Sequence, residues 1–250
     1  MKAGLKPAFL HRLIQRCQGP LIVACHQPNY LPWLGYFHKM AACDVFVILD
    51  DVQFPRRTYT TRAMVRDKRG VVRLTIPVQG AQRRQLIRDV RLCEPERNLR
   101  KHLRTLKHCY SKAPYLSHYM FFMESILAAI PDRLLDLNIA FIELIRNALG
   151  ISTPLVLSSS LGIGADVSKT MRLLQICREV GAKVYLSGQG ARAYLDEGLF
   201  QDVGVVLRYQ TFKHPVYRQC HPGFIPNLSA LDLLFNCGDR SPTLLMGDTR

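Results

Sequence analysis

The chain has 250 residues, of which 48% are hydrophobic and 21% are charged, and its mean hydropathy is +0.01. This composition excludes a disordered, collagen-like or coiled-coil protein, and the length allows a sizeable core. No apolar run approaches the roughly 20 residues of a membrane-spanning helix, and the first residues lack the pattern of a secretory signal. We therefore expect a cytoplasmic protein with no membrane span, a basic N-terminal extension over residues 1–20 and a single domain over 21–250.

Positive charge is concentrated in the first half of the chain. The formal net charge is +15, and residues 1–112 hold 22 Lys and Arg against 7 Asp and Glu, whereas residues 113–250 are balanced. A one-sided basic surface attracts partners that carry phosphate. We expect a phosphorylated or nucleotide-linked small molecule, with nucleic acid as a less favoured partner. A solvated basic face explains the same charge without any partner.

The eight cysteines are dispersed along the chain, and they form no CxxC motif. In a chain expected to stay in a reducing compartment, such cysteines are predicted to be free thiols. No second pair of Cys or His stands at zinc-site spacing from Cys220-His221, so we expect no structural metal.

Short, unbroken apolar runs predict the first two strands. Residues 21–25 and 45–49 contain β-branched side chains and are typical of strands buried on both faces. Between them, two prolines stiffen the loop 26–33, and residues 34–42 are expected to form a short helix. A strand–loop–helix–strand unit favours parallel pairing of its two strands.

An insertion of about residues 56–150 is expected after the second strand. Its first part, residues 58–77, has β-favouring residues on both sides of Asp67-Lys68-Arg69-Gly70, which predicts a basic hairpin. A further strand is expected at 87–92. Helical patterns then follow at 97–110, 115–130 and 133–149.

The rest of the chain alternates short strands with helices. Strands are expected at 154–157, 184–186 and 205–209, helices at 168–180 and 229–235, and a helical turn at 191–195. This pattern predicts an α/β fold in which helices sandwich a mainly parallel sheet, of the nucleotidylyltransferase or Rossmann-like type, with the hairpin and helices inserted. Ligands of such sheets bind at the carboxyl ends of the strands.

Two polar residues that directly follow predicted strands are our candidate catalytic groups. His26 follows the first strand and offers an acid–base group near neutral pH, and Asp50 follows the second and is suited to orient a histidine or bind a sugar hydroxyl. Because no third acidic residue stands nearby, we expect no metal there. The simpler interpretation is that His26 caps the loop backbone and Asp50 begins a turn.

Eight further residues are candidate substrate contacts. Asn29 and Tyr30 lie in the proline-stiffened loop, and Arg62 in the hairpin offers a planar fork to phosphate. Ser159 and Lys169 belong to a Ser- and Gly-rich segment that resembles a phosphate cradle but lacks the Walker A spacing. Loop packing, a surface arginine and a helix N-cap explain the same residues without a ligand. The remaining candidates follow later strands and are Ser187, Gly188 and His214.

An ordered series of sequence blocks covers about residues 22–245. The blocks are HQPNYLPWLGYFHKM (26–40), VILDDVQF (47–54), HCYSKAPY (108–115), YLSGQGARAYLD (185–196), FKHPVY (212–217) and FIPNLSALDLLFNCG (224–238). In these blocks the chain resembles the WbqC-like protein family. The resemblance supports several candidates as positions of the family's pattern, among them His26, Tyr30, Asp50, Arg62, Ser187, Gly188 and His214.

The resemblance implies a role in bacterial surface-polysaccharide (O-antigen) biosynthesis. We expect a transferase that modifies an activated or amino sugar by moving an acyl or aminoacyl unit. The cofactor is left open, with ATP and a nucleotide-sugar donor as the two expectations. The alternatives are an ATP-dependent ligase or nucleotidylyltransferase, a nucleic-acid-binding protein and a non-catalytic glycan-binding protein.

Overall fold

The computed structural model describes residues 19–80, 84–164 and 168–247. These residues form two compact units. We call them the sheet unit, which holds the described residues of 19–27, 39–52 and 152–212, and the helical unit, which holds those of 28–38, 53–151 and 213–247. The single domain predicted over 21–250 stays a prediction, and the predicted extension lies outside the described residues except for Gly19 and Pro20.

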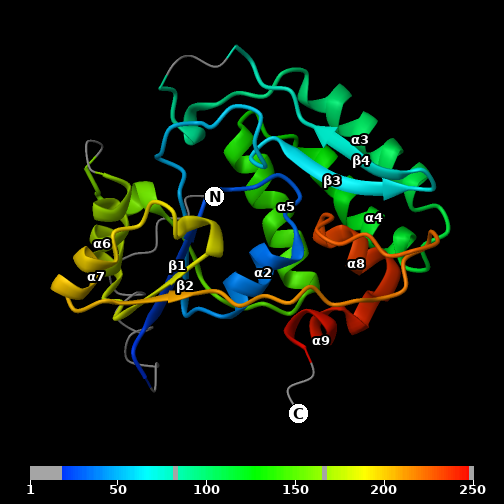
Figure 1. Cartoon of the computed structure of the whole chain (residues 1–250). Coiled ribbons are helices and arrows are strands. Elements are labelled where there is room, and N and C mark those ends of the chain that lie inside the picture. The colour runs from blue at the N-terminus through cyan, green and yellow to red at the C-terminus, as the bar shows by residue number, and fades with distance from the viewer. Residues whose placement is uncertain (1–18, 81–83, 165–167, 248–250) are drawn as a thin grey trace. The chain divides into compact units, whose positions relative to one another are not determined.

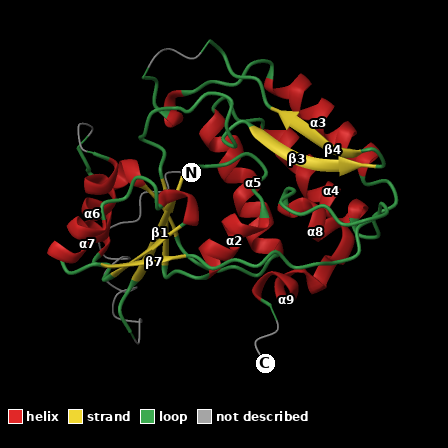
Figure 2. Ribbon diagram, viewed as in Figure 1, coloured by secondary structure: helices red, strands yellow, loops and turns green. Residues whose placement is uncertain are grey.

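The sheet unit contains five parallel strands, as the sequence predicted. Figure 1 labels its strands β1 and β2, and Figure 2 labels β1 and β7. The strands have three to five residues each and are mostly apolar; the polar exceptions are His26, Ser187 and Arg208. In spatial order they are β5 (Leu155–Leu157), β2 (Val45–Ile48), β1 (Ile22–His26), β6 (Val184–Ser187) and β7 (Val206–Tyr209).

One face of this sheet is covered by helix α6 (Lys169–Val180), which contacts β1. Alternate strand residues such as Val23, Cys25 and Val47 pack with Ile176 of the helix in one apolar core. Because side chains alternate across a strand, this core uses every second strand residue. Helix α7 (Glu197–Asp202) adds Phe200 to the same core.

Helix α2 (Leu34–Ala41) runs through the division between the two units. Residues 39–41 belong to the sheet unit, where the hydroxyl of Thr153 donates a hydrogen bond to the Met40 carbonyl at 2.8 Å. The side chain of Lys39 is buried in this part of the helix, at 4% exposure.

The helical unit contains the predicted basic hairpin of β3 (Arg62–Asp67) and β4 (Gly70–Thr75), paired antiparallel. Its turn is held by Asp67, whose Oδ1 accepts hydrogen bonds from the Arg69 and Gly70 amides at 2.7 and 3.1 Å, while Gly70 has a φ of +133°. The helices of this unit are α3 (Pro95–Cys109), α4 (Leu116–Ser125), α5 (Leu134–Ala148), α8 (Ala230–Cys237) and α9 (Ser241–Met246).

The strand predicted at 87–92 is wrong. Residues Ile87–Asp89 form the 3-10 turn η1, in which the Asp89 and Val90 amides bond to the carbonyls of Leu86 and Ile87. Only isolated bridges follow, from Arg91 to Arg133 and from Leu92 to Val78. Ile87, Val90 and Leu92 are buried around this turn, and the polar residues between them are not. A short strand gives a similar spacing of apolar residues, which is why the sequence predicted a strand.

None of the helices in the described ranges combines the length and the apolar character needed to cross a bilayer. All seven cysteines within those ranges are free thiols.

Candidate functional site

The order of the strands singles out one position in the sheet unit. From β1 the chain builds outward through β2 to β5, and it then returns to the other side of β1 to place β6 and β7. The direction of building therefore reverses between β1 and β6, which pair directly through Ile22 with Val184 and Val23 with Tyr185. In open parallel sheets, ligands bind beyond the carboxyl ends of the two strands at this reversal. Here those ends are His26 and Ser187.

His26 is half-buried at the end of β1. Its Nδ1 lies 3.0 Å from the Gln27 carbonyl oxygen, which can only accept, so Nδ1 carries the proton and Nε2 carries the lone pair. Burial, aided by the nearby charge of Lys39, lowers the pKa of His26 from 6.5 to about 3. The ring is therefore neutral at physiological pH, a form that can accept a proton or a hydrogen bond at Nε2.

Lys39 is a buried cation that sequence reasoning missed. Its Nζ donates a hydrogen bond to the Cys25 carbonyl at 2.9 Å and lies 5.9 Å from the centre of the Phe46 ring. Burial lowers the pKa of Lys39 to about 8. The sequence did contain a sign of this burial, which is a single lysine within the mostly apolar stretch 34–42. A lysine on such a helix either lies on a face exposed to water or is buried with the apolar residues.

The turn after β6 is open above its glycine. Ser187 is 1% exposed, and its carbonyl accepts a hydrogen bond from the Gln210 amide at 2.8 Å. Gln189 Nε2 donates to the Gln210 carbonyl at 2.9 Å, which ties the ends of β6 and β7 together. A Cβ added to Gly188 would meet no atom within 4 Å. The glycine thus leaves free space beside the end of the strand next to β1.

Asp50 lies at the end of β2 and is 1% exposed. Its Oδ1 accepts the Ser159 amide at 2.9 Å, and its Oδ2 accepts the Ser159 hydroxyl at 2.6 Å. The Ser158 hydroxyl oxygen lies 3.1 Å from Asp50 Oδ1 and shares its single proton between this oxygen and Asp51 Oδ1. These bonds fix the 3-10 turn η3 (Ser158–Leu161) against β2. Asp50 therefore positions this turn, and the Ser159 amide is already hydrogen-bonded. The catalytic role predicted for Asp50 and the substrate-binding role predicted for Ser159 stay predictions.

Asp51 and Arg172 form a buried ion pair that sequence reasoning did not find. Arg172 Nη1 lies 3.0 Å from Asp51 Oδ2, and each side chain is 9% exposed. Arg172 Nη2 also donates to the Gly164 carbonyl at 3.1 Å, and the Ser158 hydroxyl donates to Asp51 Oδ1. The pair joins α6 to the end of β2, beside the turn that Asp50 holds.

Lys169 is exposed at the start of α6, and its Nζ lies 5.0 Å from the centre of the Tyr194 ring. The preceding Ser168 is the N-cap, and its hydroxyl accepts the Met171 amide at 3.3 Å. The N-cap expected as an alternative to a phosphate cradle is therefore present. Residues 165–167 of the predicted cradle lie outside the described residues.

In the helical unit, three predicted contacts line one small crevice. Asn29, Tyr30 and Arg62 surround it together with the exposed ring of Tyr59, and its volume of about 10 Å³ holds about one water. Arg62 donates to the Arg57 carbonyl at 2.9 Å through Nη1. Its buried Nε has no hydrogen-bond acceptor among the described residues.

Tyr30 is at the core side of this crevice, at 1% exposure. Its hydroxyl lies 2.8 Å from Nδ1 of His102, and its ring meets the edge of Phe141. Burial raises the pKa of Tyr30 well above its usual range. Packing accounts for these contacts, and substrate binding by Tyr30 stays a prediction.

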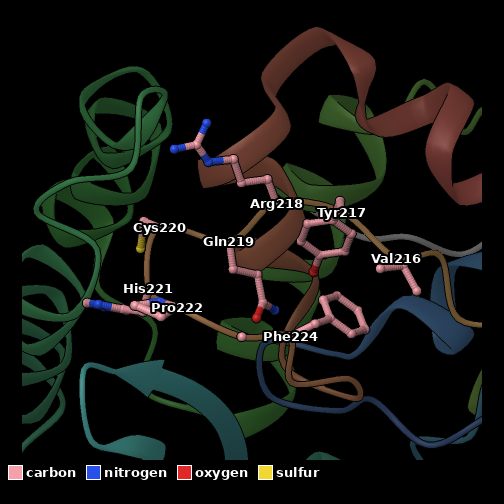
Figure 3. Close-up of a pocket in the computed structure, with 9 residues that line it drawn as sticks. Val216, Tyr217, Arg218, Gln219, Cys220, His221, Pro222 and Phe224 are labelled. Carbon is pink, nitrogen blue, oxygen red and sulfur yellow. The ribbon is translucent and has the colours of Figure 1, made fainter.

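His214 lies in the long loop of the helical unit that precedes α8. Its Nδ1 bonds to the Pro215 carbonyl at 2.8 Å, and its ring contacts Tyr217 and Phe224. The part of the loop over residues 216–224 lines an open hollow of about 580 Å³, and Figure 3 shows Gln219 beside the rings of Tyr217 and Phe224.

Gln219 anchors this loop to two buried charged residues, Arg66 and Asp232. It accepts a hydrogen bond from Arg66 and donates one to Asp232 Oδ2 at 2.7 Å, where the Tyr217 hydroxyl also donates at 2.7 Å. Asp232 is completely buried, and that burial raises its pKa although the hydrogen bonds and Arg66 oppose the rise. Arg66 donates further to the carbonyl of Pro222, so the loop has a defined conformation without helix or strand.

The predicted site residues thus divide between the two units. The sheet unit brings His26 and Gly188 to neighbouring strand ends and also holds Asp50, Ser159, Lys169 and Ser187. The helical unit holds Asn29, Tyr30, Arg62 and His214. The partnership of His214 with His26, considered from the sequence, stays a prediction.

Comparisons with known proteins agree with the resemblance found in the sequence. The model of the WbqC-like protein family matches residues 27–243. An uncharacterized protein of Mycobacterium tuberculosis, Rv1507c, is 35% identical over 226 residues, which cover 89% of this chain and 96% of that protein. No solved structure matches the chain. Because the match extends from the loop after β1 to α9, the chain belongs to the WbqC-like protein family.

Proposed function

We propose that the protein is a transferase of bacterial surface-polysaccharide biosynthesis that modifies an activated or amino sugar by moving an acyl or aminoacyl unit. One observation carries the proposal: a histidine held neutral ends β1 at the position where the strand order reverses. The open space beside Gly188, on the adjacent strand β6, supports binding of a nucleotide-linked or phosphorylated substrate there.

His26 is the proposed acid–base group. Its Nε2 lone pair accepts the proton of the sugar amine or hydroxyl as that group attacks the carbonyl carbon of the acyl donor, while the bond from Nδ1 to Gln27 holds the ring in this tautomer. The bond between the acyl carbon and the donor's leaving group then breaks, and the imidazolium returns the proton to that leaving group. The phosphates of a bound substrate favour the protonated ring and raise its pKa from about 3 towards neutrality. The base is therefore strengthened when the substrate is present.

A cytoplasmic location is part of the proposal. The seven described cysteines are free thiols, which suits a reducing compartment.

An ATP-dependent ligase or nucleotidylyltransferase is the second candidate. The five-stranded order β5-β2-β1-β6-β7 favours it, because doubly wound sheets with this pattern of reversal bind nucleotides. The two candidates differ in their ligand: the ligase requires ATP, whereas the transferase requires a sugar donor or acceptor.

Thermal-shift measurements with ATP, UDP-sugars and dTDP-sugars test the site. A ligand at about 100 times its dissociation constant is expected to add roughly 2.7 kcal/mol to the free energy of unfolding. Gly188→Val is expected to abolish this shift, because the new side chain extends into the open space from a Cβ position that meets no atom within 4 Å. Gly19→Val is the matched control at the opposite end of β1, where a Cβ also meets no atom.

Each outcome of this screen has a defined meaning. Stabilisation by a sugar nucleotide and not by ATP supports the transferase, and the reverse supports the ligase. An equal shift in wild type and Gly188→Val would contradict binding at the end of β6. If neither ligand class raises the unfolding temperature of the wild type, the result favours the nucleic-acid-binding or non-catalytic glycan-binding alternatives.

Arg62 tests a phosphate contact in the helical unit. Its buried Nε has no hydrogen-bond acceptor among the described residues, and a phosphate oxygen at the mouth of the adjacent crevice would supply one. Arg62→Ala is expected to weaken binding of a phosphorylated ligand by roughly 1.5 to 3 kcal/mol, and Arg62→Lys to restore only part, because the planar fork is lost. Calorimetric titration at two salt concentrations measures this. Arg73→Ala, an exposed arginine of the same hairpin, is the control, and equal affinity in all variants would contradict a phosphate contact at Arg62.

A further inference from the structure

Helix α3 presents an almost entirely cationic face to solvent. Seven of its residues are exposed, and six of these are basic: Arg97, Arg100, Lys101, Arg104, Lys107 and His108. The opposite side of the helix is buried through Leu99, Leu103 and Leu106. The helix period of 3.6 residues therefore gathers the cations in one stripe.

Part of this stripe has no acidic partner. Arg97 and Arg100 pair with glutamates at the start of the helix, and Lys107 pairs with Glu124 of α4. Lys101 and Arg104, in the middle of the stripe, have no carboxylate within 4.0 Å among the described residues. These two cations are available to an anionic partner.

The neighbouring helix α4 exposes large apolar side chains. Phe121 is 72% exposed and Phe122 is 45% exposed, and their rings meet edge to face with centres 5.5 Å apart. The 3-10 turn η2 (Ile126–Ala129) continues this surface, since all four of its residues are apolar and none is buried. Contiguous exposed apolar surface of this kind marks an interaction site.

The apolar and cationic groups belong to one surface, which we call the α3–α4 patch and define as Lys101, Arg104, Phe121, Phe122 and η2. Helices α3 and α4 contact each other, and α3 also contacts η2. Lys107 and Glu124 join them through an ion pair of 2.6 Å. Arg104 lies one turn before Lys107, and Phe121 lies one turn before Glu124, so both side chains face the same side of this helix pair.

We propose that the α3–α4 patch docks the protein onto a membrane surface rich in anionic lipids. The phenylalanines and η2 enter the boundary between head groups and acyl chains, and Lys101 and Arg104 contact the anionic head groups. An apolar group flanked by cations is the combination by which peripheral proteins bind such a surface.

Charge and shape favour this occupant over two others. A second copy of the chain in a symmetric dimer would place two cationic stripes against each other. A nucleic acid would satisfy the cations and could stack on a phenylalanine, but it offers nothing to the aliphatic residues of η2. Only the lipid surface accounts for both halves of the patch.

Co-sedimentation of the full chain with vesicles tests the proposal. The protein is expected to bind vesicles of equal parts phosphatidylcholine and phosphatidylglycerol, and to bind pure phosphatidylcholine far less. Phe121→Ser/Phe122→Ser is expected to reduce the partition coefficient at least about tenfold, because two rings that would be buried in the lipid are lost. Lys101→Gln/Arg104→Gln is expected to reduce it roughly twentyfold at low salt and little at high salt.

The control variants carry the same kinds of change on the sheet unit. Val203→Ser removes an apolar side chain that is 56% exposed, and Lys183→Gln/Arg208→Gln removes two exposed cations. These variants are expected to bind vesicles as the wild type does. Circular dichroism confirms that all variants keep the fold, which is expected because every substituted side chain is exposed.

Three results would overturn the proposal. The first is equal binding to vesicles with and without phosphatidylglycerol. The second is vesicle binding that survives loss of the phenylalanines. The third is a loss of oligonucleotide binding in both patch variants without a loss of vesicle binding, which would assign the patch to nucleic acid.

Discussion

Asp51→Asn is expected to lower the free energy of unfolding of the sheet unit by about 3 kcal/mol, the scale seen when one partner of a buried ion pair is removed. In this variant Arg172 would keep its charge although its side chain is only 9% exposed, and it would lose its carboxylate partner. The hydrogen bond to the Gly164 carbonyl would remain. Hydrogen exchange of amides in β1, β2 and β5 measures the effect. The single tryptophan, Trp33, lies in the helical unit, so its fluorescence reports on the other unit.

A double variant separates the ion pair from simple loss of packing. Asp51→Asn/Arg172→Met removes both charges, and it is expected to recover most of the lost stability because no buried charge is left without a partner. Glu96→Gln is the control, since its pair with Arg100 is exposed at 58% and 59% and is worth less than about 1 kcal/mol. A double variant as unstable as the single one would show that the charge of Arg172 is not the cause.

Strands β2 and β6 of the parallel sheet were predictable because burial on both faces leaves a plain mark in the sequence. Val45–Ile48 is an apolar run without interruption, and the structure buries all four residues. The same holds for Val184–Ser187, which ends in a serine that is itself buried. A run of this kind needs no knowledge of its partners to be identified as a strand.

The partners of polar residues were not predictable in this way. Arg172 is 121 residues from Asp51, and on the sequence it is one of several arginines at helical positions. Asp50 was assigned to catalysis, but nothing in its neighbourhood revealed that Ser158 and Ser159 would bind its carboxylate. Such contacts depend on how strands are ordered in space, which short-range patterns do not contain.

The exposed phenylalanines illustrate the same limit from the opposite side. Residues 115–130 were predicted as one helix, and they form α4 followed by the 3-10 turn η2. An apolar helical segment is ordinarily assigned to the core. Tyr119, Met120 and Met123 follow that rule, whereas Phe121 and Phe122 between them do not. Only the packed structure distinguishes the two sets.

His26 gives the protein a specific sensitivity to acid that can be measured without a substrate. Its pKa is about 3 in the folded protein against 6.5 as the ordinary value, so between these values the unfolded chain binds more protons. The contribution of the neutral His26 to the free energy of unfolding is therefore fully present above pH 6.5, and it falls as the pH decreases below that value. The fall amounts to about 2 kcal/mol at pH 5.

His26→Gln is expected to remove this part of the pH dependence. The difference in free energy of unfolding between wild type and variant should decrease by about 2 kcal/mol from pH 7.5 to pH 5, because glutamine does not titrate. Urea titrations at several pH values in this range, monitored by hydrogen exchange of the β1 amides, measure this difference in free energy. Lys39→Met should shrink the decrease, since the charge beside His26 contributes to its lowered pKa. His108→Gln, on the exposed face of α3, is the control variant. A difference between wild type and His26→Gln that stays constant over the range would mean that folding leaves the pKa of His26 unshifted, and it would contradict the ring held neutral by burial and by the charge of Lys39.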